Sequence, residues 1–389
     1  MVRLEIQTAL GSSNMAAVDR VLVVGGSMAG MSCAIQMRKA GIAVDLVEID
    51  PTWKAVGAGI TITGPTLRAL KTIGVLPEVL AAGATWNSIK VHDKAGTLLE
   101  EAPLHAIGPD LPTTGAVLRP LLHKILAAAT TASGVNVRLG LSVTELAEHP
   151  HQVEATFSDG TQGRYDLVVG ADGIFSKTRD MIFPGAAKPR FTGQVIYRLL
   201  AERPPGVDRT YFFMGGDYKV GFNPVSATHM YMYLLQPAPN NPWIDAKDQP
   251  QRLYEAMDGF GGFIPQIRDT VRTTNAHTVN YRPLEVLLQP APWYRGHVVL
   301  IGDAAHSTTP HLASGAGMAI EDGIVLTEEI QTQPTLTAAL EKFMERRFER
   351  CRLVIENSVK LGDIEMNHGS TAEHTRLMVE ALSALRQPI

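Results

Sequence analysis

The stretch that decides the fold is Val21 to Asp50, VLVVGGSMAGMSCAIQMRKAGIAVDLVEID. Its first four residues are apolar and predict a short buried β-strand. A glycine-rich turn follows, then a helix-like segment that ends at Gly41, and then a second apolar strand from Ala43 to Val47. The order of strand, tight turn, helix and strand predicts a parallel βαβ unit, and therefore a Rossmann-like α/β domain.

The turn of this unit has a glycine pattern that suits a pyrophosphate. Gly25 lets the strand turn sharply, and Gly30 lets the helix pack closely on the strand. Backbone N–H groups at the start of the helix favour a negative charge. Glu48 follows Gly30 by 18 residues, close to the spacing of roughly 20 for an acid that binds a ribose hydroxyl. The prediction is a dinucleotide site formed by Gly25, Gly26, Ser27, Met28, Ala29, Gly30 and Glu48.

Ser27 stands where the pattern G-x-G-x-x-G has its middle glycine. A serine is small enough for close approach of a phosphate, and its hydroxyl can donate a hydrogen bond. Two other interpretations of the turn stay open, an ordinary βα turn and the nucleophile elbow G-x-S-x-G of hydrolases. The elbow lacks its last glycine, because Ala29 occupies that position, and no Asp-then-His pair in a matching context follows.

Composition excludes several classes of protein. The chain has 389 residues, a formal net charge of −4, 45% hydrophobic residues and 19% charged residues. This length predicts two domains, or one domain with a large insertion. The negative charge argues against nucleic-acid binding, and no apolar run reaches the length of a membrane span. Two distant cysteines, Cys33 and Cys351, favour the reducing cytoplasm without a disulfide framework, and we expect no metal site.

We expect four parts along the chain. Residues 1–18 are predicted to be a flexible N-terminal extension without the pattern of a signal peptide. Residues 19–185 and 285–335 are predicted to form a discontinuous nucleotide-binding domain. Residues 186–284, rich in aromatic residues and in alternation, are predicted to form a mixed β-sheet domain that binds substrate, together with a hairpin near 86–99. Residues 336–389 are predicted to be a C-terminal helical segment dominated by one long helix.

Four stretches together resemble the single-component FAD-dependent aromatic hydroxylases of the p-hydroxybenzoate and salicylate hydroxylase type. They are VLVVGGSMAG with the later VEID, GAGI at 57–60, DLVVGADGIFSKTR at 166–179, and GHVVLIGDAAHSTTPHLASGAGMAIEDG at 296–323. The resemblance runs from about Val21 to Thr332 and covers the cofactor motifs in their usual order. The β-sheet region carries no comparably specific motif.

The resemblance implies a set of FAD-binding residues. The glycine turn would hold the pyrophosphate and Glu48 the adenosine ribose, while the loop with Gly59 would lie against the flat cofactor. Arg119 would contact the ribityl–phosphate side, and Asp303 a ribityl hydroxyl. The start of a helix would face the pyrimidine edge of the flavin, where an anion forms on reduction. Asp172, with Ser176 and Arg179, resembles a motif shared between FAD and NAD(P)H. The helix start consists of Gly315, Ala316, Gly317 and Met318.

The implied reaction is hydroxylation of a ring. NADH or NADPH reduces FAD, O2 adds at C4a to give a hydroperoxide, and an electron-rich ring attacks the distal oxygen. The protein must exclude water and deprotonate or polarise a ring hydroxyl. Pro310 would lie beside the position where oxygen reacts. His311 would be a base or a substrate contact, unless it is an ordinary structural histidine of the loop.

The expected substrate is a small hydroxylated aromatic or N-heteroaromatic ring, bound by a monomer or homodimer. Arg198 would bind a substrate carboxylate or form an ion pair inside the fold. Alternatives are an FAD-dependent oxygenase or reductase acting on a non-aromatic substrate, by epoxidation or Baeyer–Villiger chemistry, and a flavin-binding regulatory protein without turnover. Candidates for the pocket wall, each alternatively plain sheet core, are Tyr197, Tyr211, Tyr218 and His229.

Overall fold

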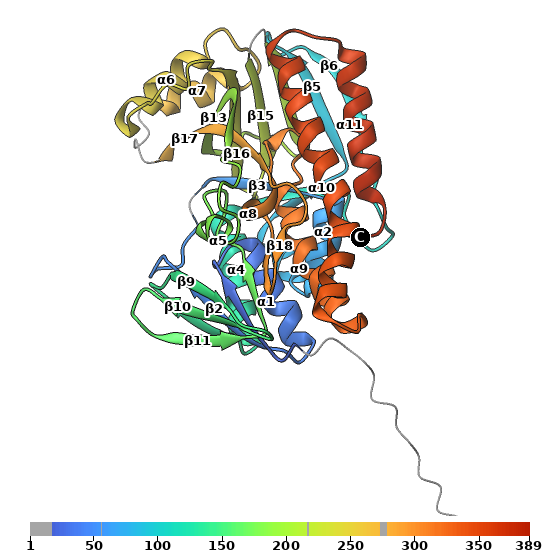
Figure 1. The fold of residues 1–389 in the computed structure, drawn as a ribbon. Helices are drawn as coiled ribbons and strands as arrows, with labels where there is room; N and C mark the ends of the chain where they lie inside the picture. The colour runs from blue at the N-terminus through green and yellow to red at the C-terminus, as the bar shows by residue number, and fades with distance from the viewer. Residues whose placement is uncertain (1–17, 56, 216–217, 273–277) are drawn as a thin grey trace, which may run out of the picture.

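The structure is a computed structural model that describes residues 18–55, 57–215, 218–272 and 278–389. The expected N-terminal extension, residues 1–18, lies outside these ranges except for its last residue. Figure 1 shows two stacked parts, with a mostly parallel sheet and its helices below and a larger mixed sheet above, in which only β14 and β5 pair in parallel among the described strands.

The lower part is built on a six-stranded sheet in the order β18-β19-β12-β1-β2-β8. Its strands run parallel except β18 at the edge. The predicted βαβ unit is β1, α1 (Met28–Lys39) and β2, and the expected Rossmann-like fold is confirmed. The strands span Tyr294–Arg295 (β18), Val298–Leu300 (β19), Leu167–Gly170 (β12), Arg20–Val24 (β1), Ala43–Glu48 (β2) and Asn136–Leu139 (β8).

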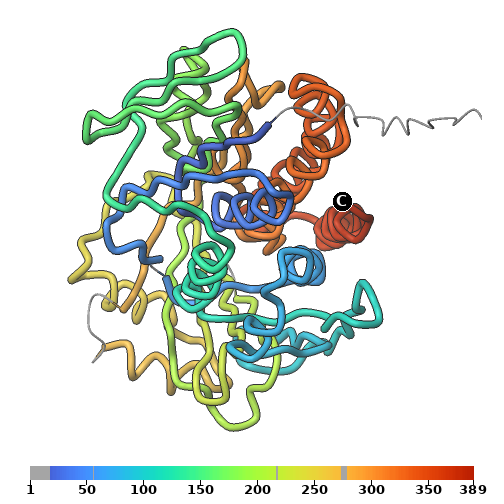
Figure 2. Tube along the Cα trace, turned by 90° about the horizontal axis from the view of Figure 1, so that it is seen from below, coloured from blue at the N-terminus to red at the C-terminus, as the bar shows by residue number. Residues whose placement is uncertain are grey.

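Helices cover this sheet because the apolar faces of the helices and the sheet are buried against each other in one core. α1 packs against α9 (Gly315–Thr332) so closely that a Cβ on Gly323 would lie 2.6 Å from Cys33 Cα. The expected long C-terminal helix is α10 (Leu336–Met366), and α11 (Thr371–Arg386) packs on it. Figure 2 shows the N-terminal βαβ unit near the middle, with the C-terminal helices on one side of it. The other helices are Gly64–Ile73 (α2), Leu76–Ala82 (α3), Arg119–Ala132 (α4), Lys177–Ile182 (α5) and Asp303–His306 (α8).

The upper part is a seven-stranded sheet in the order β17-β13-β16-β15-β14-β5-β6. The expected hairpin near 86–99 is placed here, as β5 and β6. The alternating pattern of residues 186–284 predicted strands, but the structure also has two helices there, which cover one face of the sheet. They are α6 (Gln249–Ala256) and α7 (Ile264–Val271). The strands span Asn280–Leu288 (β17), Arg190–Glu202 (β13), His229–Pro237 (β16), Tyr218–Pro224 (β15), Thr210–Gly215 (β14), Ser88–Asp93 (β5) and Leu98–Pro103 (β6).

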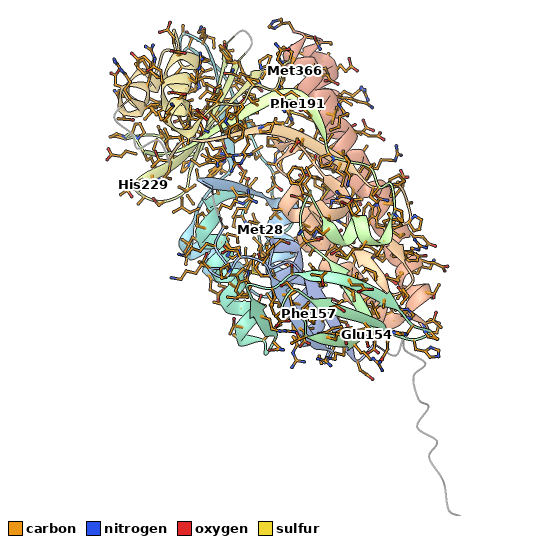
Figure 3. All side chains as sticks on the ribbon, turned by 60° about the vertical axis from the view of Figure 1, so that its left-hand side comes forward. Met28, Glu154, Phe157, Phe191, His229 and Met366 are labelled. Carbon is orange, nitrogen blue, oxygen red and sulfur yellow. The ribbon has the colours of Figure 1, made fainter. Side chains whose placement is uncertain are left out.

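Two three-stranded sheets complete the fold. β3 (Gly59–Thr63), β7 (Thr114–Leu118) and β4 (Ala84–Trp86) form a sheet below the face of the large sheet that the helices leave free. β9 (Val143–Glu148), β10 (Val153–Phe157) and β11 (Gln162–Tyr165) form the other, where Figure 3 labels Glu154 and Phe157. Two 3₁₀ turns are Ala246–Asp248 (η1) and Pro310–Leu312 (η3).

Candidate functional site

The glycine turn between β1 and α1 leaves no room for side chains. Gly25 has a φ of +105°, and a Cβ there would lie 2.5 Å from the carbonyl oxygen of Ala171. A Cβ on Gly30 would lie 2.0 Å from the carbonyl oxygen of Gly25. The Ser27 hydroxyl caps α1, since it accepts the N–H of Gly30 at 3.3 Å and donates to the Ala171 carbonyl at 2.9 Å. The turn is therefore as tight as close approach to a pyrophosphate requires.

Glu48 ends β2 beside this turn. Its carboxylate accepts the N–H of Gly26 at 2.7 Å and the N–H of Asp50 at 2.8 Å. Trp53, which the sequence did not single out, donates its indole N–H to the Gly26 carbonyl at 2.9 Å. An acid beside a tight glycine turn fits the adenosine diphosphate half of FAD. These residues line one cavity of about 410 Å³, together with Ser27, Met28, Arg119, Asp172 and Gly173.

Arg119 and Asp303 lie further along, at the first residues of α4 and α8. Both side chains are exposed, yet burial is the main cause that lowers the pKa of Arg119 and raises the pKa of Asp303. Exposed side chains and pKa values shifted by burial are consistent with each other if Arg119 and Asp303 line an internal space that protein surrounds on most sides. The opposite charges of the two residues interact and oppose both shifts. The arrangement provides one cation and one hydrogen-bond acceptor for a polar cofactor.

The first turn of α9 follows the η3 turn that carries Pro310. Within the described ranges no side chain caps this helix start, because the Ser314 hydroxyl donates instead to the Leu312 carbonyl at 2.7 Å. The N–H groups of residues 315–317 therefore suit an acceptor or an anion. Met318 differs, since its side chain is buried in the core and its N–H donates to the Ser314 carbonyl at 2.9 Å.

Asp172 is held by its own turn. It accepts hydrogen bonds from the Ser176 hydroxyl at 2.5 Å and from the N–H and hydroxyl of Thr178 at 2.9 and 3.0 Å. Arg179 is fully buried and donates to the carbonyls of Ala304 and Ile174, both at 2.9 Å. This motif therefore ties α5 to α8, and so positions Asp303.

Three of the four predicted pocket residues lie on the face of the large sheet that α6 and α7 cover. Tyr197 packs against Tyr281, with ring centroids 5.0 Å apart, and Tyr211 stacks on His92 at 5.5 Å. Both belong with Tyr218 to the hydrophobic core under α6 and α7. The prediction failed because alternation shows which residues share a face, but not which face a helix covers.

The remaining candidate, His229, begins β16, and its Nδ1 lies 2.9 Å from the Thr228 hydroxyl. Figure 3 places it at one end of the large sheet, whereas Met28 lies at the glycine turn. The structure therefore does not bring His229 together with the predicted cofactor residues.

The free face of the large sheet carries aromatic residues that the sequence analysis missed. Tyr231 packs on β3, because a Cβ on Gly59 would lie 2.5 Å from Tyr231 Cβ. Its hydroxyl accepts a hydrogen bond from Nε of Arg198 at 3.2 Å. Tyr233 lies next to it, with ring centroids 5.5 Å apart. The run MYMYLL from Met230 to Leu235 contained this signal, since alternation puts both tyrosines on one face.

His311 has a buried imidazole, with its side chain 1% exposed. Its Nδ1 lies 2.8 Å from the Thr309 hydroxyl, and its Nε2 lies 3.5 Å from a carboxylate oxygen of Glu365 on α10. Burial alone would raise the pKa of Glu365, but the positive charge of Lys219, the nearby imidazole of His311 and the hydrogen-bonded His374 hold that pKa well below its usual value. The structure places His311 in the packing between η3 and α10, while Pro310 is only half-buried.

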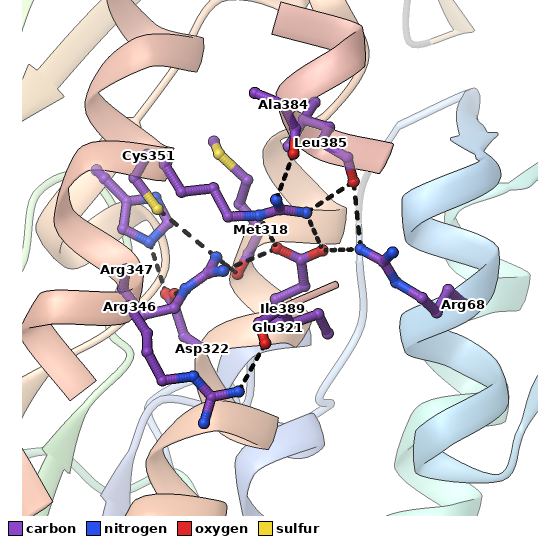
Figure 4. Close-up of polar contacts among 12 residues, drawn as sticks. Arg68, Met318, Glu321, Asp322, Arg346, Arg347, Cys351, Ala384, Leu385 and Ile389 are labelled. Carbon is purple, nitrogen blue, oxygen red and sulfur yellow. Dashed lines mark hydrogen bonds and ion pairs between the residues drawn. The ribbon is translucent and has the colours of Figure 1, made fainter. Parts of the chain in front are cut away.

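A buried ion network joins α9 and α10 (Figure 4) and reaches His306 of α8. His306, Asp322 and Cys351 present ligand atoms within 4.8 Å of one another, as metal ligands would. However, Arg347 Nε donates to Asp322 at 2.8 Å and its Nη2 lies 3.6 Å from Cys351 Sγ. A guanidinium thus already supplies the positive charge, and we interpret the cluster as an ion-pair network.

This network predicts how stability depends on pH. Burial opposes the charged form of His306, but Asp322, whose carboxylate lies 2.5 Å away, holds its pKa well above the usual value. The stabilisation is complete below the unfolded-state pKa of about 6.5 and decreases as pH rises through the raised folded-state value. Thermal unfolding from pH 6 to 9 should show this alkaline loss in the wild type and less of it in His306→Gln. Equal slopes in the two proteins would contradict the assignment.

Comparison with known proteins identifies relatives over most of the chain. Residues 19–194 match the family described as FAD binding domain. The 6-hydroxynicotinate 3-monooxygenase of Bordetella bronchiseptica is 30% identical over 86% of this chain and 89% of its own. The 2-heptyl-3-hydroxy-4(1H)-quinolone synthase of Pseudomonas aeruginosa is 33% identical over 79% of each chain.

Solved structures share the fold. The tetrameric form of 2-methyl-3-hydroxypyridine-5-carboxylic acid oxygenase is 25% identical, with a TM-score of 0.79 over 95% of this chain and 96% of that one. HpxO of Klebsiella pneumoniae, complexed with FAD and uric acid, has the same TM-score over 95% of this chain and 93% of that one, at 24% identity. Within the described ranges, no helix is long and apolar enough to span a membrane.

Proposed function

Because the chain belongs to the single-component FAD-dependent hydroxylases and is an FAD-dependent monooxygenase, we propose that it hydroxylates a small hydroxylated aromatic or N-heteroaromatic ring with NADH or NADPH and O2. Relatives named for hydroxynicotinate and for a hydroxyquinolone support the choice of ring. The expected domains fit this division of labour, with residues 19–185 and 285–335 binding FAD, and residues 186–284 with the hairpin near 86–99 binding substrate.

One observation carries the proposal. The N–H of Arg119 donates to the Ala58 carbonyl at 3.2 Å, and a Cβ on the next residue, Gly59, would lie 2.5 Å from Tyr231 Cβ on the large sheet. The strand beside the predicted cofactor residue Arg119 therefore packs directly on the aromatic face, which supports a cofactor and a ring side by side. A ring bound on the tyrosines would lie next to a flavin held by Arg119, Asp303 and the start of α9.

In the proposed site the chain binds, orients and excludes water. The N–H groups of the glycine turn would hold the pyrophosphate, and Glu48, which accepts the N–H of Gly26, would bind the adenosine ribose. FAD, when bound, supplies the transfer of one oxygen atom from O2 to the ring, with NAD(P)H as the electron source. Water exclusion falls to Pro310 and to an apolar cluster between the two parts. The buried members of this cluster are Ala58, Trp86, Ala116, Val225 and Tyr231.

The test is NAD(P)H oxidation by the purified holoenzyme in air, across hydroxylated benzoates, phenols, hydroxypyridines and quinolones. We expect one class of ring to accelerate oxidation and to gain one oxygen atom by mass. Oxidation that never depends on a ring, with peroxide as its sole product, would refute the proposal. Acceleration by an alkene or a ketone alone would instead support the non-aromatic alternative.

A further inference from the structure

A second cavity lies between the end of β17 and α10. It has a volume of about 350 Å³, within the range of roughly 300–1,000 Å³ that is typical of small-molecule sites. Its lining residues come from three segments, residues 187–190, 286–288 and 355–360, and none of them lines the cavity at the glycine turn. We call this cavity the α10 groove. It contains none of the predicted cofactor residues and none of the tyrosines of the aromatic face.

The floor of the α10 groove is aliphatic. Val286 and Leu288 are two residues apart on β17, so their side chains share one face of the strand. Ile355 and Val359 are four residues apart and share one face of α10. Leu288 and Val359 are only half-buried, so a ligand that covered them would remove apolar surface from water. No aromatic residue is among the described residues that line the groove, so the floor suits an aliphatic chain better than a ring.

Two of the four charged residues that line the groove are already neutralised. Lys188 pairs with Asp180, whose carboxylate oxygens both lie 2.8 Å from its Nζ. Glu356 pairs at 3.1 Å with Arg352, which lies one turn earlier on α10. The charges of Lys188 and Glu356 are therefore balanced within the protein, and neither is left for a ligand.

The other two charged residues, Arg190 and Lys360, are cations. Both are exposed, and neither forms an ion pair or a side-chain hydrogen bond with any residue that the structure describes. Arg190 begins β13 and is aligned with Val286 in the register of the two strands, so its side chain starts at the edge of the apolar floor. A planar guanidinium matches the two oxygens of a carboxylate. The groove therefore combines an apolar floor with two cations that have no partner.

The end of β17 also connects the groove to α8. The backbone of Leu288 pairs with His306 in an isolated antiparallel bridge, and the N–H of Gln289 donates to the Ala305 carbonyl at 2.8 Å. α8 begins at Asp303, a predicted FAD residue. The groove thus adjoins a segment of the predicted cofactor site but shares no lining residue with the cavity at the glycine turn. A ligand in the groove therefore leaves that cavity free for FAD.

We propose that the α10 groove binds a medium-chain aliphatic carboxylate. The aliphatic chain lies on the floor formed by β17 and α10, and the carboxylate binds Arg190 and Lys360. This site is additional to the sites proposed for FAD and for the ring, so the inference does not depend on the proposed reaction.

The test is isothermal titration calorimetry of the holoenzyme with octanoate. Two matched probes separate the two features of the groove. Octan-1-ol has the chain without the charge, and butyrate has the charge on a chain that is shorter by four methylene groups. Octanoate should bind at least about 10-fold more tightly than either probe, because each probe loses one of the two contacts. Equal affinities for octanoate and either probe would overturn the inference.

Variants test whether octanoate binds in the groove itself. The double variant with Arg190→Gln and Lys360→Gln should bind octanoate roughly 10-fold more weakly, while its affinity for octan-1-ol changes little. Val359→Asp places a negative charge on the floor and should weaken octanoate binding at least as much. Lys247→Gln removes an exposed cation of η1 outside the groove, and it should bind octanoate as the wild type does. If the double variant keeps the wild-type affinity for octanoate with FAD still bound, the ligand binds elsewhere and the inference is refuted.

Discussion

Gly30→Ala is expected to abolish FAD binding. The new Cβ would lie 2.0 Å from the Gly25 carbonyl oxygen, so α1 must move away from β1 and its N–H groups leave the pyrophosphate position. Alanine in a helix normally gains up to about 1 kcal/mol over glycine. The steric cost must exceed that gain, because overpacking typically costs about 1–3 kcal/mol. The purified variant should be nearly colourless, with FAD affinity reduced at least about 100-fold, equivalent to roughly 3 kcal/mol.

Gly108→Ala is the matched control. A Cβ on Gly108 would have no heavy atom within 4 Å, and the residue does not have a positive φ. This variant should retain FAD at the wild-type level. A yellow Gly30→Ala protein with unchanged affinity would show that the glycine turn does not hold the cofactor.

Arg347→Met is expected to destabilise the fold by about 3 kcal/mol. The side chain is fully buried and pairs with Glu321 and Asp322, each at 2.8 Å, as Figure 4 shows. Removing one partner of a buried ion pair costs about 3–5 kcal/mol, because the other charge stays buried. The lower end of this range applies because Glu321 is still paired with Arg350 and Asp322 with His306. Urea unfolding of the holoenzyme, followed by circular dichroism and by flavin absorbance, measures the change.

Arg352→Met provides the comparison on the same helix. Arg352 pairs with Glu349 and Glu356 at the surface, where solvent screens the interaction. Its urea midpoint should not change measurably. If Arg347→Met also leaves the midpoint unchanged, the buried network does not stabilise the contact between α9 and α10.

The two variants separate two requirements of the same site. In the proposed site Gly30 would act on the cofactor directly, whereas Arg347 donates to the Met318 carbonyl at 3.0 Å. Through Met318 and Asp322 the network holds the start of α9 and the Gly302 N–H, which donates to Asp322 at 2.8 Å. We therefore expect Arg347→Met to lose stability before it loses FAD affinity.

The sequence alone determined the βαβ unit, the family and the cofactor motifs. Each residue that the predicted dinucleotide site needs lies within the βαβ unit, residues 21–50. Gly25 supplies the positive φ, Gly30 supplies the close approach of helix and strand, and Glu48 follows at a set spacing. Such local features depend on which residues are neighbours along the chain, so they can be derived from the sequence.

The tertiary structure decided which face of the large sheet the helices cover. Alternation grouped Tyr197 with one face of β13 and Arg198 with the other. Only the packing in three dimensions shows that α6 and α7 cover the face of Tyr197, and that β3 packs on the opposite face. The same holds for His311, whose imidazole is buried because α10 returns from far along the chain to pack on η3. Contacts between distant segments depend on how whole faces pack, and no spacing within a motif encodes them.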